Sequence, residues 1–246
     1  MTIDSENDIR QLKTIGRICA EALKTMIKAV RPGISTAELD EIGRVFLEAE
    51  GARSAPQVMY NFPGTTCISV APVIAHGIPD AYRLEGDDLI HIDVSAELNG
   101  YYADTGASVI VDKCPEAEKL VEATKATLWK ILRNARAGSR LNEIGRTVQA
   151  EAQRHGFHPI VDLTGHGIGH SLHEEPHEVL NFYNPLDKRV LNEGLVLAIE
   201  PFLTTGRGRV SELTDGWSLR TTDRALAAQF EHTVIITRGQ PVVLTL

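Results

Sequence analysis

The chain has 246 residues, of which 43% are hydrophobic, so it is long enough to bury a sizeable core. Its formal net charge of −8 argues against a surface for nucleic acids or anionic membranes, and no apolar run approaches the length of a membrane span. Three separated cysteines and the lack of a signal-peptide pattern predict a soluble cytoplasmic protein with reduced thiols.

Two amphipathic helices are expected at the start of the chain. Apolar residues recur at helical spacing from Ile9 to Val30, and Arg31-Pro-Gly33 ends the run. Ser35-Thr-Ala-Glu38 has the spacing of a capping box, which predicts a second helix that ends near Gly51. We interpret both as amphipathic helices that pack on the core.

A β-hairpin with two carboxylates is predicted next. The run 89–96 alternates between apolar and polar residues, and Asn99-Gly100 is a strong signal for a two-residue turn. With that turn Asp93 pairs with Gly106, and Asp93 and Asp104 become diagonal neighbours on one face, about 7–8 Å apart. Unpaired carboxylates placed in this way indicate a bound cation. The alternative is an ordinary solvated face of the sheet.

The plan of two helices separated by a stop returns in the middle of the chain. A long helix is expected over 117–136, and a shorter one ends near His155-Gly156. Asp40-Glu-Ile-Gly-Arg44 in the first pair matches Asn142-Glu-Ile-Gly-Arg146 in the second pair. We therefore expect a single domain built from two related halves. These halves would comprise about residues 1–110 and 111–246.

Histidine is concentrated in one short region, because six of the nine histidines lie between His155 and His177. His173-Glu-Glu-Pro-His177 fits the letter pattern of zinc peptidases, which need both histidines on a continuous helix. Pro176 would break that helix, so this interpretation is disfavoured. The region is instead expected to be a glycine-flanked loop or strand that presents His166 and His173 to partners elsewhere in the chain.

Two later segments supply further acidic residues. The runs 195–202 and 229–236 are typical of buried strands, and among their apolar residues they carry Glu200 and Glu231. A lone buried glutamate is costly unless it is paired or bound to a metal. Four carboxylates with one imidazole would suit divalent manganese, iron or cobalt at least as well as zinc. Two ions bridged by shared carboxylates are plausible with such a ligand set.

Eight motifs occur in a fixed order along the chain. They are His76-Gly-Ile-Pro-Asp80, Ile92-Asp93-Val, Asp104-Thr, Gly165-His166-Gly-Ile-Gly, His173-Glu-Glu-Pro176, Ile199-Glu200-Pro, Asp215-Gly-Trp217 and Phe230-Glu231-His-Thr233. Together they resemble type I methionine aminopeptidases, which belong to the M24 "pita-bread" metallopeptidases. The resemblance covers nearly the whole chain. It implies an α/β fold of the α+β kind with pseudo-two-fold symmetry, in which helices and antiparallel strands of two halves surround a central metal site.

The resemblance also implies a function. The protein would be a metal-dependent hydrolase that removes the N-terminal methionine from nascent proteins and peptides, preferentially before a small second residue. Its partner would be the N-terminal peptide, met at the ribosome by a monomeric enzyme, with no role for nucleic acid or membrane. No zinc-finger extension precedes residue 1 and no long insertion lies between His173 and Glu200, which is similar to the short bacterial form.

Five metal ligands are implied by the same resemblance, together with a cofactor of two divalent ions, which would be cobalt, manganese, iron or zinc. Asp93 would hold one ion, Asp104 and Glu231 would bridge both ions, and His166 and Glu200 would complete the other.

Further residues would act on the substrate. Glu200 would accept a proton from the attacking water, and His173 and His76 would hydrogen-bond the reacting peptide. Four positions match those that line the pocket for the methionine side chain, although ordinary core packing would also explain them. They are Phe62, Cys67, Leu172 and Trp217.

Three departures from the family pattern concern the surroundings of the site. Ala71-Pro72 replaces the usual Asn-Glu, Tyr102-Ala103 replaces His-Gly, and Leu172 stands where an aromatic ring is common. Such changes would alter the pocket shape and the catalytic efficiency, and they suit a secondary copy of the enzyme. The alternatives are another M24 aminopeptidase or Xaa-Pro dipeptidase, or a non-catalytic peptide-binding module.

Overall fold

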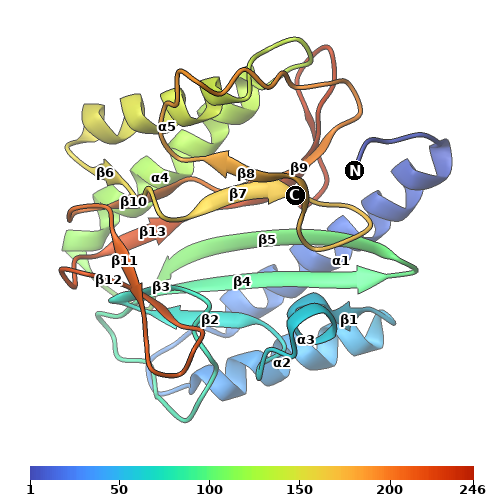
Figure 1. The fold of residues 1–246 in the computed structure, drawn as a ribbon. Coiled ribbons are helices and arrows are strands. Elements are labelled where there is room, and N and C mark those ends of the chain that lie inside the picture. Colours follow the sequence, from blue (N-terminus) through green and yellow to red (C-terminus); the bar gives the residue numbers. More distant parts are fainter.

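Two helix pairs frame the computed structural model, which describes residues 1–246 (Figure 1). α1 spans Glu6–Ala29 and α2 spans Thr36–Ala49, and the predicted capping box of α2 is present at Ser35. The second pair is α4, Pro115–Asn134, and α5, Asn142–His155. All four predicted helices are therefore confirmed to within a few residues. A further short helix, α3, spans Ala55–Tyr60.

Fifteen strands form four antiparallel sheets between and around the helices. The first sheet contains β1 (Arg53–Ser54), β2 (Cys67–Val70), β4 (Leu89–Leu98) and β5 (Tyr101–Ile110). The largest contains β7 (Thr164–Gly167), β8 (Glu174–Leu180), β9 (Val196–Ile199), β14 (His232–Ile235) and β15 (Val242–Val243). A third contains β6 (His158–Pro159), β10 (Phe202–Thr204) and β13 (Ala227–Gln229), and the last contains β3 (Val73–Ala75), β11 (Val210–Glu212) and β12 (Leu219–Thr221).

The predicted hairpin is confirmed in its register. β4 and β5 pair along their whole length around the Asn99-Gly100 turn, and both turn residues have positive φ angles. Asp93 lies opposite Gly106, as expected from that turn. Asp93 and Asp104 therefore occupy the same face of one continuous ladder.

The two later acidic segments differ from the expectation of one strand each. The first divides into β9 and β10, with Glu200-Pro201 between them, and the second divides into β13 and β14. β9 pairs with β14 and β10 pairs with β13, so both segments change sheet at the same level. Pro201 has no N–H for a ladder, which favours a break there. Glu200 and Glu231 thus lie at a double junction between two sheets.

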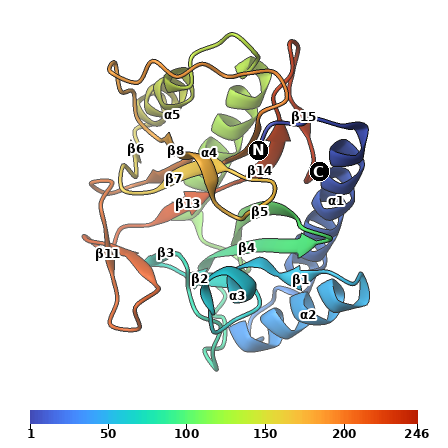
Figure 2. The ribbon, with the colours of Figure 1, turned by 45° about the vertical axis from the view of Figure 1, so that its right-hand side comes forward.

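Each helix pair covers its own part of the strands. In Figures 1 and 2 the blue helix α1 runs along the green hairpin, whereas α4 and α5 lie against the strands of the later part of the chain. One apolar core joins α1 and α2 to the hairpin, and a second core joins α4 and α5 to β9, β10 and β14. No helix is both long enough and apolar enough to cross a membrane. The face of the strands away from the helix pairs is left to form the site.

Candidate active site

The five residues expected to bind metal meet in one cavity. Asp93 lies on β4, Asp104 on β5 and His166 on β7, and the two glutamates lie at the strand junctions described above. All five line a cavity of about 250 Å³ on the strand face. Asp104, His166 and Glu231 are the most buried of them, and Asp93 and Glu200 keep a partly exposed edge.

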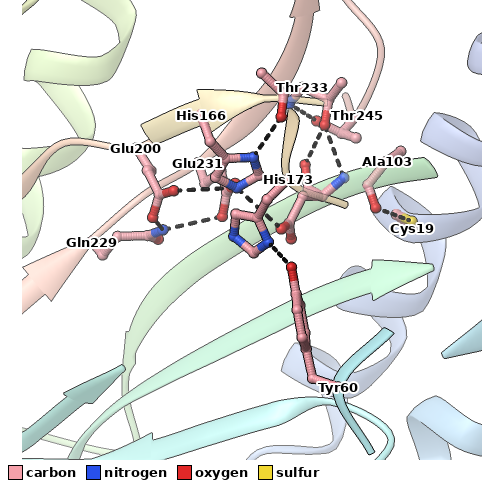
Figure 3. A network of polar contacts seen from close by, with 12 residues as sticks. Cys19, Tyr60, Ala103, His166, His173, Glu200, Gln229, Glu231, Thr233 and Thr245 are labelled. Atoms are coloured by element: carbon pink, nitrogen blue, oxygen red, sulfur yellow. Dashed lines mark hydrogen bonds and ion pairs between the residues drawn. The ribbon is translucent and has the colours of Figure 1, made fainter. Parts of the chain in front are cut away.

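His166 faces the carboxylates through a ring nitrogen that carries no proton. Its Nδ1 lies 3.0 Å from the carbonyl oxygen of Gly167, to which it donates, and burial lowers the pKa of the ring to about 3. The lone pair of Nε2 therefore points toward Glu200 Oε1 at 3.6 Å (Figure 3). It also points toward Asp104 Oδ2, at 3.9 Å. A lone pair that faces carboxylate oxygens is repelled by them unless a cation lies between.

The carboxylates also resist ionisation as a group. Burial raises the pKa of Asp104 to about 6. Burial and then the charges of neighbouring carboxylates raise the pKa values of Asp93, Glu200 and Glu231. Divalent ions in this cluster would offset both the burial and the mutual repulsion.

Unpartnered polar atoms support the same conclusion. Asp93 Oδ1, Asp104 Oδ1 and Glu231 Oε1 are buried without a hydrogen-bond partner. Ligand atoms of Asp104, His166 and Glu231 lie within 4.8 Å of one another. Because buried polar atoms are almost always satisfied in native proteins, these free oxygens fit the role of metal ligands. The donor set of oxygens with one imidazole suits first-row divalent ions.

The backbone around the cluster is tied across the two halves of the chain. The Thr233 hydroxyl accepts a hydrogen bond from the Asp104 amide and donates to the Asp104 carbonyl, both at 2.8 Å. The Glu231 amide donates to the Gly106 carbonyl at 2.9 Å, and the Thr105 hydroxyl donates to the Glu231 carbonyl at 2.9 Å. The hairpin and the strand junction are therefore held in fixed relation at the cavity.

Gln229 is a site residue that the sequence reasoning missed. Its side-chain nitrogen lies 3.1 Å from Glu231 Oε2 and 3.3 Å from Glu200 Oε2, so one amide bridges both glutamates (Figure 3). Its backbone amide donates to the Ser108 hydroxyl at 2.9 Å. The spacing of Gln229 and Glu231, two apart in an extended segment, was the signal that could have placed both side chains on one face.

The two expected substrate-facing histidines lie at the mouth of the cavity, where both are exposed. His76 has a positive φ of 55°, an uncommon conformation for a residue with a side chain. The next residue, Gly77, accepts from the Ile68 amide and donates to the Ser69 hydroxyl, both at 3.0 Å. Because such strain persists only where the surroundings enforce it, the location of His76 suits a functional role.

His173 reaches the cavity from the loop between β7 and β8. Its ring lies 4.1 Å from the ring of His166, and its Nδ1 lies 2.7 Å from the hydroxyl of Tyr60. The other histidines of this region point elsewhere. His170 packs on Tyr101, and His177 is exposed beside Glu175.

The expected side-chain pocket forms the apolar wall of the same cavity. Phe62, Cys67 and Leu172 are buried, and the ring of Phe62 meets the ring of Trp217 edge-on at 5.2 Å. Leu172 thus lines the cavity directly. All four residues of the predicted set are brought together, which agrees with a small apolar binding pocket next to the acidic cluster.

The residues of the other two departures do not line the cavity. Ala71-Pro72 forms the connection between β2 and β3 and does not line the cavity. Tyr102 is buried, with its amide bound to the Gly169 carbonyl at 2.8 Å and its hydroxyl near the sulfur of Met59. Tyr102 therefore contacts the glycine loop after His166 and supports the site from outside.

Comparison with known proteins establishes the class of this fold and site. The profile of metallopeptidase family M24 matches residues 10–238, so the protein is a metallopeptidase. Methionine aminopeptidase 2 of Bacillus subtilis is 44% identical over 100% of this chain and 99% of its own length.

Solved structures agree with the sequence match. The methionine aminopeptidase of Thermotoga maritima superimposes with a TM-score of 0.96 at 31% identity, over 100% of this chain and 99% of that one. The enzyme from Rickettsia prowazekii gives a TM-score of 0.94 at 32% identity, with full coverage of both chains. A prolidase of Pyrococcus horikoshii, at 22% identity and a TM-score of 0.79, shares the fold alone.

The chain therefore belongs to the methionine aminopeptidases of metallopeptidase family M24. The resemblance seen in its motifs and the expected pita-bread fold are confirmed. The protein is a metal-dependent aminopeptidase, a hydrolase that works with a divalent metal cofactor.

Proposed function

We propose that this enzyme removes the N-terminal methionine from nascent proteins and peptides, preferentially when the second residue is small. One observation carries the proposal. The cavity joins an acidic cluster, in which three buried carboxylate oxygens lack partners, to an apolar pocket formed by Phe62, Cys67, Leu172 and Trp217. A substrate whose first side chain fills the pocket would place its scissile carbonyl at the acidic cluster.

Two divalent ions would be held by the five residues, with the roles given above for each ligand. When bound, divalent ions lower the pKa of water and polarise a carbonyl group. The residues fit this cofactor because their free oxygens and the His166 lone pair converge. The physiological ion is cobalt, manganese, iron or zinc.

The protein residues supply orientation and proton transfer. Glu200 would accept a proton from the attacking water, and Gln229 orients the carboxylate for this through its hydrogen bond to Oε2. His173 and His76 would donate hydrogen bonds to the reacting peptide from the mouth of the cavity. The apolar wall excludes water from the first side chain of the substrate.

A ligand substitution tests the metal assignment. Glu231→Ala removes a bridging carboxylate, so metal content and turnover should both fall sharply, whereas Glu193→Ala, at an exposed glutamate paired with Arg238, should change neither. Near-normal turnover of a Met-Ala peptide by Glu231→Ala would show that the two-ion assignment is wrong.

A substrate panel tests the specificity. The metal-reconstituted enzyme is incubated with Met-Ala-Ser, Leu-Ala-Ser and Ala-Pro-Ala, and preferential loss of the first residue from Met-Ala-Ser is expected. Cleavage of only the proline peptide would overturn the proposal in favour of an Xaa-Pro enzyme. Turnover of none of the three by enzyme with full metal content would favour a binding module.

The organisation and setting of the enzyme follow the same proposal. The chain would be a single catalytic domain of two related halves, about 1–110 and 111–246, and it would act as a cytoplasmic monomer on chains that emerge from the ribosome. The matched residues Asp40 and Asn142 support the relation of the halves, because the side chain of each joins the second helix of its pair to a distant loop.

A further inference from the structure

Tyr60 is the last residue of α3, at the rim of the cavity, and it contacts a substrate-facing histidine from the other half of the chain. Its hydroxyl oxygen lies 2.7 Å from Nδ1 of His173, and the two ring centres are 5.6 Å apart (Figure 3). Both residues line the cavity that contains the acidic cluster. Nothing in the motifs of the sequence marks Tyr60 for a role.

Both partners of this contact are fixed by their surroundings. α3 is capped by Ser54, whose hydroxyl accepts from the Gln57 amide and donates to the Thr65 carbonyl, and the helix ends at Asn61 in the left-handed conformation. The ring of His173 is held from the other side by the ring of His166. The hydrogen bond therefore joins two positioned groups.

The chemistry of this contact sets which nitrogen of His173 carries the proton. A neutral imidazole has one N–H and one acceptor nitrogen, and the hydrogen bond at one nitrogen decides the tautomer. Partial burial raises the pKa of Tyr60, so the phenol keeps its proton and can donate it to Nδ1. The hydrogen of His173 then lies on Nε2, the nitrogen left for a ligand in the cavity.

We propose that Tyr60 is a positioning residue which, through its hydrogen bond to Nδ1, holds His173 as the Nε2–H tautomer that donates to the substrate carbonyl. The proposal rests on the proposed aminopeptidase function. Tyr60 acts through His173 and makes no contact with the reacting atoms. Removal of its hydroxyl should therefore slow the reaction without affecting the metal.

The test compares two Tyr→Phe variants in the metal-loaded enzyme. Tyr60→Phe should lower kcat on Met-Ala-Ser about tenfold, the size of one lost hydrogen bond, with little change in KM or metal content. Tyr82→Phe is the matched control, because Tyr82 is equally exposed but its hydroxyl bonds to Asp88 away from the cavity. The control should keep the wild-type kcat.

A double-mutant cycle separates action through His173 from an independent effect. In a His173→Gln background, Tyr60→Phe should cause no further loss of kcat, because its partner is absent. Equal fractional losses in both backgrounds would overturn the proposal, as would a wild-type kcat for Tyr60→Phe. Failure of the wild-type enzyme to cleave Met-Ala-Ser would instead count against the aminopeptidase function itself.

The tautomer is also directly observable. In the zinc-loaded enzyme, labelled with ¹⁵N at histidine and assigned with His173→Gln, the proton of His173 should reside on Nε2. Tyr60→Phe should shift the population toward a mixture of tautomers. A wild-type spectrum with the proton on Nδ1 would overturn the proposal.

Discussion

The two halves of the chain deliver their acidic residues in different ways. In residues 1–110, Asp93 and Asp104 come from one hairpin whose ladder is unbroken from Leu89 to Ile110. In residues 111–246, Glu200 and Glu231 come from a strand pair that breaks at both glutamates and passes from one sheet to another. An intact ladder fixes side chains by its pleat, whereas a junction frees them from the pleat.

The difference shows which contacts position the carboxylates of each half. The hairpin needs only its own register to bring two carboxylates onto one face. The junction needs further support. Within its own half Gln229 bridges the two glutamates, and from the first half the Gly106 carbonyl accepts a hydrogen bond from the Glu231 amide. The second pair of carboxylates is therefore positioned in part by the first half.

The largest expected effect concerns a matched pair of helix glycines, Gly43 in α2 and Gly145 in α5. A Cβ at Gly145 would lie 2.1 Å from the Phe182 carbonyl oxygen, whereas one at Gly43 would meet the flexible end of Met26. Gly145→Ala should lower the free energy of unfolding by about 3 kcal/mol or more. Gly43→Ala should change it by about 1 kcal/mol or less, since helix propensity offsets the shift of Met26. Denaturant unfolding of both variants measures the difference, and equal losses would contradict it.

A second prediction concerns the hydrogen bonds between the Thr233 hydroxyl and the backbone of Asp104, which join β14 to the hairpin. Thr233→Val leaves the amide and carbonyl of Asp104 without their hydroxyl partner in a buried place, which should cost about 2 kcal/mol of unfolding free energy. Thr237→Val, at an exposed loop, is the control and should be near neutral. An unchanged denaturation midpoint for Thr233→Val would show that these two hydrogen bonds contribute little to the free energy of unfolding.

A third prediction addresses the junction alone. Gln229→Met keeps the length of the side chain but removes the amide that bridges Glu200 and Glu231. We expect kcat/KM to fall about tenfold, as for the loss of hydrogen bonds to charged groups. Gln153→Met, on the exposed side of α5, provides the comparison. The idea that the junction needs this bridge is abandoned if both variants are equally active.

The smallest effect concerns the outer end of the hairpin. The Asp8 carboxylate accepts from the amides of Asp4 and Ser5 and from the Tyr101 hydroxyl, and these hydrogen bonds lower its pKa. A lowered folded-state pKa gives stability that is complete above the unfolded value, about 3.9, and is lost as pH falls through the folded value.

The unfolding free energies of the wild type and Asp8→Asn give the measurement. Their difference should be constant from about pH 7 to 5 and shrink below about pH 4. A difference that grows on acidification would have the wrong sign for this explanation.

The hairpin and the junction also differ in how well the sequence predicted them. The hairpin register was predictable because alternation and the Asn99-Gly100 turn are local signals, and they agree with each other. The break at Glu200 had a local signal in Pro201. The break at Glu231 was not predictable, because apolar strands on either side of a junction have the same local pattern. The approach of the two glutamates depends on pairing between distant segments, which local patterns do not encode.

The residues of the candidate site also divide into those that the sequence predicted and those that it did not. The closeness of Asp93 and Asp104, and a site of four carboxylates with one imidazole, followed from the residues themselves. The role of each ligand followed from the family resemblance. Gln229 and Tyr60 were missed because an amide and a phenol carry no charge that demands a partner. Their roles appear only when the contacts of Gln229 with Glu231 and of Tyr60 with His173 are known.

The double junction also bears on how the enzyme is made. Of the proposed ligands Glu231 is the last to be synthesised, and it follows Asp93 by more than half the chain. A nascent chain cannot complete the ion site until β14 has docked beside β9. Ions that bind only the finished site would add about 4 kcal/mol of stability at a thousandfold excess over Kd. Metal uptake would thus select fully folded molecules and leave prematurely ended chains unloaded.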